Sequence, residues 1–238
     1  IADGVTHFNP FDNKLNDSSL LTLTNIWVNS ISFNRFSSKW GFDISNSRNR
    51  GKVLLTYGLE SRALTDWTLR SRVNITRRIT FETIGKKGIN QLISGNVKFD
   101  NHNYEVQQYS IEPRLTYTKG ANFRIIGGYK FNSKVNRQGA KEEYHANSLN
   151  TDIKYNILQS ASLQGKFTYS TISYPYPVNN TVSYIMLDGL QPGRNMLWSL
   201  DLTKRLGKNL EMNIQYEGRK PGENRVIHIG RASLRAIL

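Results

Sequence analysis

A strict alternation of apolar and polar residues near the C-terminus constrains the fold most. Between Leu210 and Glu217 every second residue is apolar, and the run from Trp198 to Thr203 repeats the pattern. Successive side chains of a strand point to opposite faces, so both runs predict strands with one apolar and one polar face. The chain closes on a further alternating run from Val226 to Leu238. A last strand that pairs with the first leaves no free edge, as in a closed membrane barrel.

The same alternation recurs along the chain from Leu21 onward and predicts about eleven strands, each near the ~9–11 residues that a tilted strand needs to cross a bilayer. No run of 18 or more apolar residues exists, which excludes transmembrane helices. We therefore predict an all-β fold, an antiparallel transmembrane β-barrel with about 11–12 strands visible, possibly part of a larger barrel. Residues 1–17 are expected to be an irregular lead-in and residues 18–238 the barrel. Because single-chain barrels usually have even strand numbers, either residues 1–17 supply a twelfth strand or further strands precede Ile1, and we expect the second.

The expected connections alternate in length. Short ones are predicted at 35–39, 76–78, 119–121, 158–161 and 206–209, and longer loops at 46–53, within 86–103, and at 133–143 and 175–195. Outer-membrane barrels have short periplasmic turns and longer outer loops, so this predicts the outer membrane, with Leu238 on the periplasmic side. Pro113 lies on the apolar face of its strand and cannot donate to a ladder, which predicts a bulge or an unpaired position.

The alternation also assigns side chains to the two faces of the wall. The residues predicted to face lipid are Trp198, Leu200, Leu202, Leu210, Met212, Ile214, Tyr216 and Leu234. Those predicted to face the lumen are Arg70, Arg72, Arg124, Lys154, Asp152, Lys166, Asp201, Glu211, Arg231 and Arg235. Charges of both signs in a small barrel would interlock and fill the lumen rather than leave a wide channel.

The net charge of +14 comes largely from cations in predicted turns and loops, such as Arg48, Arg50, Lys52, Arg77 and Arg78. Such positions would lie at headgroup level, either as a solvated rim or as a site for anionic lipid, with outer-membrane lipid and lipopolysaccharide as the expected partners. Nucleic acid is not expected, because no basic helix or recognisable binding motif is present. Four tryptophans are predicted to be interfacial anchors: Trp27, Trp40, Trp67 and Trp198.

Catalytic signatures are weak, and we expect neither an enzyme nor a cofactor or metal. The chain has no cysteine, and no histidine pair has metal-ligand spacing. An outer-membrane hydrolase would nevertheless place an acid and a histidine at the outer rim. The residues that keep this alternative open are His102, His145 and His228 with Asp100, Glu142 and Glu143, all near predicted outer ends of strands.

Several runs resemble the C-terminal β-barrel region of large, poorly characterised outer-membrane proteins of Bacteroidota. They include NITRRITFET (74–83), YSIEPRLTY (109–117), MLDGLQPGRNMLWSL (186–200), LEMNIQYEGRKPG (210–222) and HIGRASLRAIL (228–238). The resemblance covers nearly the whole chain and is most specific over 186–238. It implies a long preceding region, exposure at the cell surface, and insertion by the barrel-assembly machinery, which reads the last strand. The corresponding assembly signal here is Leu234, Ala236 and Leu238.

The function predicted from the sequence is therefore non-catalytic. The barrel would anchor a surface-exposed region or act as a subunit of an envelope assembly, with other envelope proteins as partners. A pore or protein-export channel is a second hypothesis, which predicts conductance in planar bilayers, and the rim hydrolase is a third.

Overall fold

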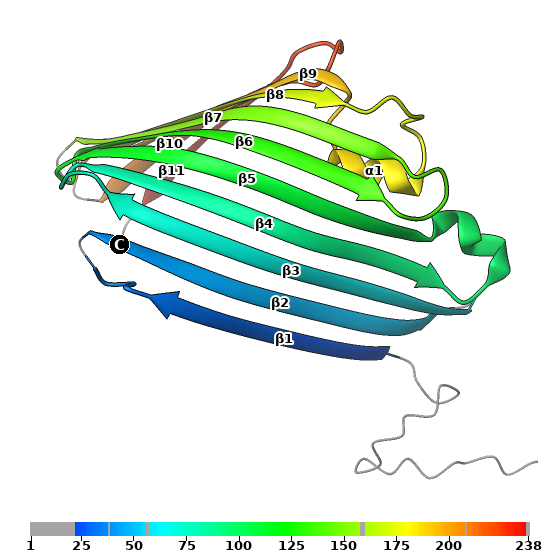
Figure 1. Cartoon of the computed structure of the whole chain (residues 1–238). Coiled ribbons are helices and arrows are strands. Elements are labelled where there is room, and N and C mark those ends of the chain that lie inside the picture. The colour runs from blue at the N-terminus through cyan, green and yellow to red at the C-terminus, as the bar shows by residue number, and fades with distance from the viewer. Residues whose placement is uncertain (1–21, 38, 56–57, 158–159, 208, 237–238) are drawn as a thin grey trace, which may run out of the picture.

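The computed structural model describes residues 22–37, 39–55, 58–157, 160–207 and 209–236. The predicted lead-in of residues 1–17, and Leu238, lie outside the described residues. The described chain is almost entirely strand (Figure 1). Its strands are β1 (Thr22–Phe33), β2 (Trp40–Leu55), β3 (Gly58–Asn74), β4 (Ile79–Ser94), β5 (Tyr104–Lys119), β6 (Phe123–Asn136), β7 (Glu143–Ile157), β8 (Ala161–Ser173), β9 (Gly193–Arg205), β10 (Leu210–Lys220) and β11 (Ile227–Ala236).

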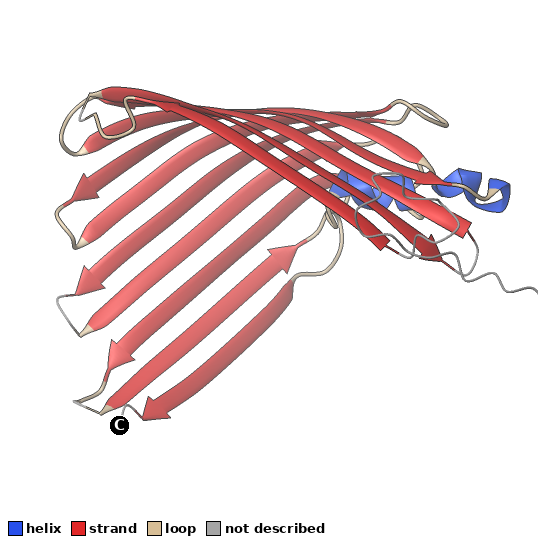
Figure 2. Cartoon of the chain, turned by 90° about the horizontal axis from the view of Figure 1, so that it is seen from below, coloured by secondary structure: helices blue, strands red, loops and turns tan. Residues whose placement is uncertain are grey.

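Every strand pairs antiparallel with the next one along the chain, so the eleven strands form one meander. This confirms the predicted fold class and the predicted strand number. Within the described residues β1 pairs with β2 alone and β11 with β10 alone, so the sheet keeps two open edges rather than a first-to-last pairing. Figure 2 shows that the sheet is strongly curved and that a helix of the β8–β9 connection lies on its concave side.

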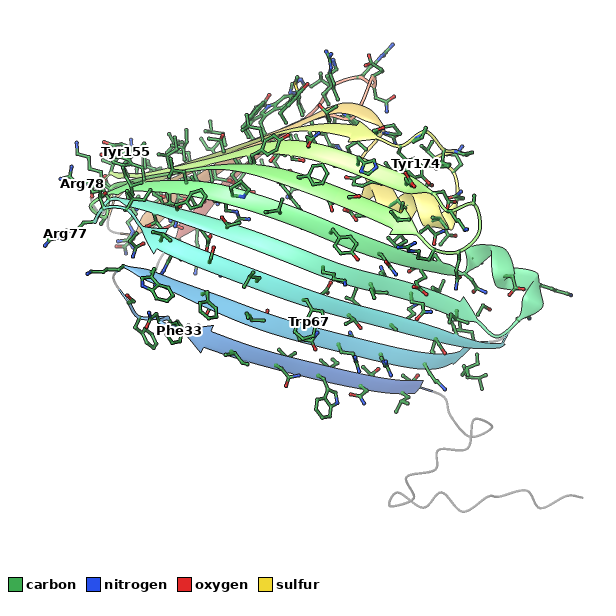
Figure 3. All side chains as sticks on the ribbon, in the orientation of Figure 1. Phe33, Trp67, Arg77, Arg78, Tyr155 and Tyr174 are labelled. Atoms are coloured by element: carbon green, nitrogen blue, oxygen red, sulfur yellow. The ribbon has the colours of Figure 1, made fainter. Side chains whose placement is uncertain are left out.

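The ladder register sorts the side chains into two faces. The convex face carries half-buried and exposed apolar residues, and on β6 and β7 they occupy nine-residue spans, Phe123 to Phe131 and Leu149 to Ile157. This span matches the ~9–11 residues of a membrane crossing. Aromatic side chains on this face resemble the aromatic girdles of membrane barrels. Phe33 and Trp40 lie at the end with the short turns, with ring centroids 5.5 Å apart, and Trp67 lies near the middle of β3 (Figure 3).

The strands are longer than the sequence predicted. β3 has 17 residues, and β2 includes 46–53, which was predicted to be a loop. That prediction was wrong because strand hydrogen bonds do not require apolar side chains once a strand has left the lipid band. Asn46, Arg48 and Arg50 continue the convex face of β2 with polar side chains, and the β1–β2 pairing continues through them without a change of register.

The short turns lie together at one end of the strands, beside the end of β11, as predicted. At the opposite end of the strands the loops are shorter than predicted. β4 extends to Ser94 before the 3-10 helix η2 (Val97–His102), and β6 extends to Asn136. One connection at this end is itself short, because only residues 56–57 separate β2 from β3. The β5–β6 ladder is interrupted between Ile111 and Arg114 without a change of register, so Pro113 causes an unpaired position and no bulge.

The connection between β8 and β9 contains the α-helix α1 (Thr181–Leu187). None of the described helices is long and apolar enough to cross a membrane. The helix α1 lies on the concave side of the curved sheet (Figures 1 and 2).

Candidate functional site on the concave face

The helix α1 begins at a capping box. The Asn180 side-chain oxygen accepts a hydrogen bond from the Ser183 amide at 2.6 Å, and the Ser183 hydroxyl accepts one from the Asn180 amide at 3.1 Å. Asp188 ends the helix in the left-handed conformation, with φ 52°. The sequence prediction of a loop over 175–195 missed this helix. Its signal was present, because an Asn three residues before a Ser, followed by the apolar run Ile185 to Leu187, is a helix-start pattern.

One side of α1 is buried against the concave face of the sheet. Met186 is fully buried, and Val182 and Leu187 accompany it. The strands contribute a matching apolar patch that comprises Leu92, Tyr104, Val106, Tyr144, Ala146 and Ile172. Burial of one such apolar side chain stabilises by about 1.5–3 kcal/mol, so these contacts hold a seven-residue helix that would not form alone.

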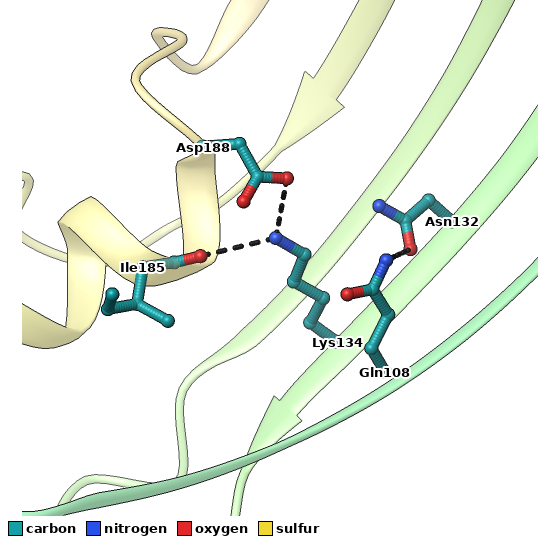
Figure 4. Close-up of polar contacts among 5 residues, drawn as sticks. All are labelled: Gln108, Asn132, Lys134, Ile185 and Asp188. Carbon is teal, nitrogen blue, oxygen red and sulfur yellow. Dashed lines mark hydrogen bonds and ion pairs between the residues drawn. The ribbon is translucent and has the colours of Figure 1, made fainter. Parts of the chain in front are cut away.

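A buried lysine adds a polar contact at the end of α1. Lys134 on β6 is only 3% exposed, and its Nζ lies 2.7 Å from Asp188 Oδ2 and 3.2 Å from the carbonyl oxygen of Ile185 (Figure 4). The same Nζ lies 5.2 Å from the centroid of the Tyr144 ring. An isolated charge is costly to bury, so the Lys134 ammonium requires these partners. The ion pair therefore joins α1 to the sheet.

A cavity of about 480 Å³ lies next to this ion pair on the concave face. Its charged lining mixes both signs: Glu112, Arg114, Lys130, Asp152, Lys166 and Asp188. Glu112 and Arg114 form an ion pair of 2.7 Å, and the hydroxyls of Ser148 and Ser170 lie 2.8 Å apart. The cavity is suited to water or to a small polar solute.

The register places all predicted face residues as the sequence grouped them. All eight residues predicted to face lipid share the convex face, since Trp198 pairs with Gly218, Leu200 with Tyr216 and Leu202 with Ile214, while Met212 pairs with Leu234. The ten residues predicted to face the lumen share the concave face. Contact with lipid itself stays a prediction. Of the predicted assembly signal, Leu234 and Ala236 lie on the convex face and Leu238 is outside the described residues.

Two of the lumen-facing arginines are held by local contacts. Arg70 Nε lies 3.4 Å from Glu82 Oε1. Arg72 donates to the carbonyl oxygens of Arg35 and Ser37, both at 3.0 Å, and so fixes the β1–β2 turn. Of the two, the Arg70–Glu82 contact pairs opposite charges as predicted, whereas Arg72 binds backbone carbonyl groups.

The three rim histidines belong to different elements, η2, β7 and β11, at the edge of the sheet with the longer loops. His145 has Glu143 at 4.0 Å, whereas His228 stacks on Tyr216 and accepts or donates a 2.8 Å hydrogen bond with its hydroxyl. In the part of the chain that the structure describes, no three His, Asp or Glu side chains are placed to hold a metal ion.

Glu142 is part of a hydrogen-bond network at this rim. Its carboxylate is buried and accepts a 2.8 Å hydrogen bond from the Asn136 side chain, which is 1% exposed. The Asn136 oxygen in turn accepts from the Glu105 amide at 3.1 Å. This network ties the β6–β7 connection to β5, so Glu142 has a structural role in the fold.

Comparisons with known proteins find similar folds among solved structures and no matching family. No protein-family profile matches the chain, and a search of curated proteins finds no match. Among solved structures, the chain is similar to the translocator domain of autotransporter NalP from Neisseria meningitidis, with a TM-score of 0.39 and 9% sequence identity. That similarity covers 91% of this chain and 80% of the other.

Proposed function

We propose that the protein forms the wall of an outer-membrane β-barrel and has a non-catalytic role, either to anchor a surface-exposed region or to act as a subunit of an envelope assembly. The observation that carries this proposal is the convex apolar band. It covers a nine-residue span on β6 and on β7, while the charged residues within these two spans lie on the concave face. Large apolar surfaces of this kind are not left exposed by soluble monomers.

The concave face favours an anchor over a permanently open pore. The helix α1 is packed onto β4–β8, and Lys134 and Asp188 hold its end in place. Below it, paired charges such as Glu112 and Arg114 occupy the inner surface. A barrel whose lumen is occupied by side chains and a folded loop conducts ions poorly.

Membrane integration provides the test. The protein should resist extraction from membranes by alkaline carbonate and urea and should require detergent to stay dispersed. Replacing Ile125 and Ile153 on the convex face with Asp should prevent integration, whereas Asp at Thr116 and Asn150 on the concave face should not. Integration that is indifferent to the face of the substitution would refute the proposal.

Closure of the barrel is testable because the chain has no cysteine. We propose that β1 and β11 lie at a closing seam, either against each other or against additional strands. Cysteines introduced at Ser30 and Ser233 in the membrane-embedded protein should form a disulfide if the two edges meet. The two residues lie on the concave face of their strands, so a cross-link reports direct pairing. Absence of a cross-link would indicate additional strands.

A channel gated by α1 is the second candidate, and the concave cavity beside Asp188 favours it. If α1 closes a pore, replacing residues 175–191 with a short flexible linker should raise the conductance in planar bilayers. If the barrel is an anchor filled by its own side chains, the same deletion should leave the conductance near that of the parent protein.

A further inference from the structure

The convex face carries a group of cations beside its apolar band. Arg48 and Arg50 project from β2 at every second position, and Lys87 projects from β4. All three are exposed. The residues directly across from Arg48 are Trp27 and Thr65, and those across from Arg50 are Asn25 and Ala63. No carboxylate therefore stands directly opposite either arginine. Arg48 and Arg50 carry like charges two residues apart, which repel each other, and no directly opposite carboxylate offsets this repulsion.

These cations line a groove of about 660 Å³ on the convex face, together with Trp67, Ile89 and Gln91. Glu105 is the acidic residue of its lining, and it lies on β5, three strands from Arg50. Strands are about 4.8 Å apart, which places Arg48 and Lys87 roughly 10 Å from each other. Guanidinium groups bind phosphate through two parallel hydrogen bonds, so the groove is suited to a phosphorylated group.

A second, apolar hollow of about 540 Å³ adjoins this groove on the side of the short turns. The two hollows share Trp67 and Lys87. Apolar side chains line the second one: Ile44, Leu69, Tyr109, Ile111 and Phe131. Gly85 lies at its centre, between Leu69 and Ile111 in the ladder, and its missing side chain creates the hollow.

The height of the groove along the wall matches a membrane interface. Arg48 comes eight residues after Trp40 at the short-turn end of β2, and Lys87 comes eight residues after Ile79 at the same end of β4. Phe131, at the upper end of the apolar band, comes eight residues after Phe123 on β6. The cations therefore lie level with the upper end of the band, where lipid headgroups would be, and the apolar hollow lies at acyl-chain level.

We propose that the two hollows form one binding site for a phosphorylated lipid of the outer leaflet. Arg48, Arg50 and Lys87 bind its phosphate groups, Trp67 packs at the junction, and an acyl chain lies over Gly85. This inference rests on the proposed membrane location and goes beyond it by naming a ligand class and a site. The spacing of the cations favours a headgroup with two phosphates over one with a single phosphate.

The site can be tested on the full chain in nanodiscs of zwitterionic phosphatidylcholine with diphosphorylated lipid A as the probe, by native mass spectrometry. The combined variant Arg48→Ala, Arg50→Ala, Lys87→Ala should bind the probe about tenfold more weakly, because three exposed ion pairs are lost. The matched control is Arg77→Ala, Arg78→Ala, Lys119→Ala. It removes the same charge from the short-turn rim, where Arg77 and Arg78 lie in the β3–β4 turn (Figure 3) and Lys119 ends β5, and it should leave binding unchanged. Equal loss in both triple variants would overturn the proposal.

Two further arms separate a lipid from a free phosphate compound. Gly85→Leu should fill the apolar hollow and weaken binding of lipid A, whereas Gly165→Leu, on the convex face of β8, should not. Inorganic pyrophosphate should compete poorly. If it competes fully and Gly85→Leu has no effect, the site binds free phosphates and the lipid assignment fails. If the variants insert normally but lipid binding never changes, this site is refuted while the proposed membrane role stands.

Discussion

The ion pair between Lys134 and Asp188 makes a directional prediction, because its two partners differ in exposure. The Lys134 side chain is 3% exposed and that of Asp188 is 63% exposed. Replacing Asp188 with Asn leaves a buried ammonium whose polar contacts reduce to the Ile185 carbonyl and the new amide. Replacing Lys134 with Met removes the buried charge, keeps most of the volume, and leaves a carboxylate that water can reach.

The expected magnitudes follow from that difference. A buried charge that loses its ionised partner costs up to about 3–5 kcal/mol, and the exposure of Asp188 lowers this to about 2 kcal/mol for Asp188→Asn. Lys134→Met should reduce the stability of α1 docking by less than about 1 kcal/mol. The buried member of the ion pair is then replaced by an apolar side chain of similar size, and such a replacement is nearly neutral. The more exposed residue is thus expected to be the more sensitive one.

Amide hydrogen exchange of α1 measures the local opening that this contact opposes. A change of 2 kcal/mol corresponds to about a thirtyfold faster exchange of the amides from Tyr184 to Leu190. Lys154→Met, on the concave face of β7 away from α1, is the matched control and should leave these rates unchanged. If Lys134→Met accelerates exchange more than Asp188→Asn, the argument from buried charge is wrong.

Three other substitutions probe separate contacts. Gly218→Ala should destabilise the barrel by about 1–3 kcal/mol, because the new Cβ would overlap the Trp198 indole, whereas Gly230→Ala meets open space and should be neutral in urea unfolding. Burial raises the pKa of Tyr174 to about 12, so the β8–β9 connection that contains α1 should lose stability as the pH rises from 10 to 12; Tyr174→Phe should reduce that loss of protection in hydrogen exchange. Asn180→Ala removes the cap of α1 and should cost about 1 kcal/mol, seen as faster α1 exchange but unchanged strand exchange.

The faces of the wall could be predicted because they depend on local chemistry alone. The period of two in Leu210, Met212 and Ile214 predicts the same faces that the ladder shows. A register shift by one residue would move all three side chains to the opposite face of the sheet, so the pattern specifies the register. The strand number followed from the same pattern. Strand ends could not be predicted, because Arg48 and Arg50 continue β2 with polar side chains that resemble a loop.

The candidate site was less accessible to sequence reasoning. Lys134 was grouped with a charged loop, and Asp188 lies 54 positions away in the chain. Only the fold of the β8–β9 connection brings them together. The groove of Arg48 and Lys87 likewise joins β2 and β4 across β3, and depends on register.

By itself, the sequence determined that this chain forms antiparallel strands with one apolar and one charged face, because alternation fixes the side of each residue in any extended strand. Tertiary structure decided how far the strands continue past the apolar band, where α1 docks, and which cations share a groove. Those features arise from pairings between distant segments, such as Trp67 with Lys87 and Lys134 with Asp188, whose register and curvature no local pattern encodes.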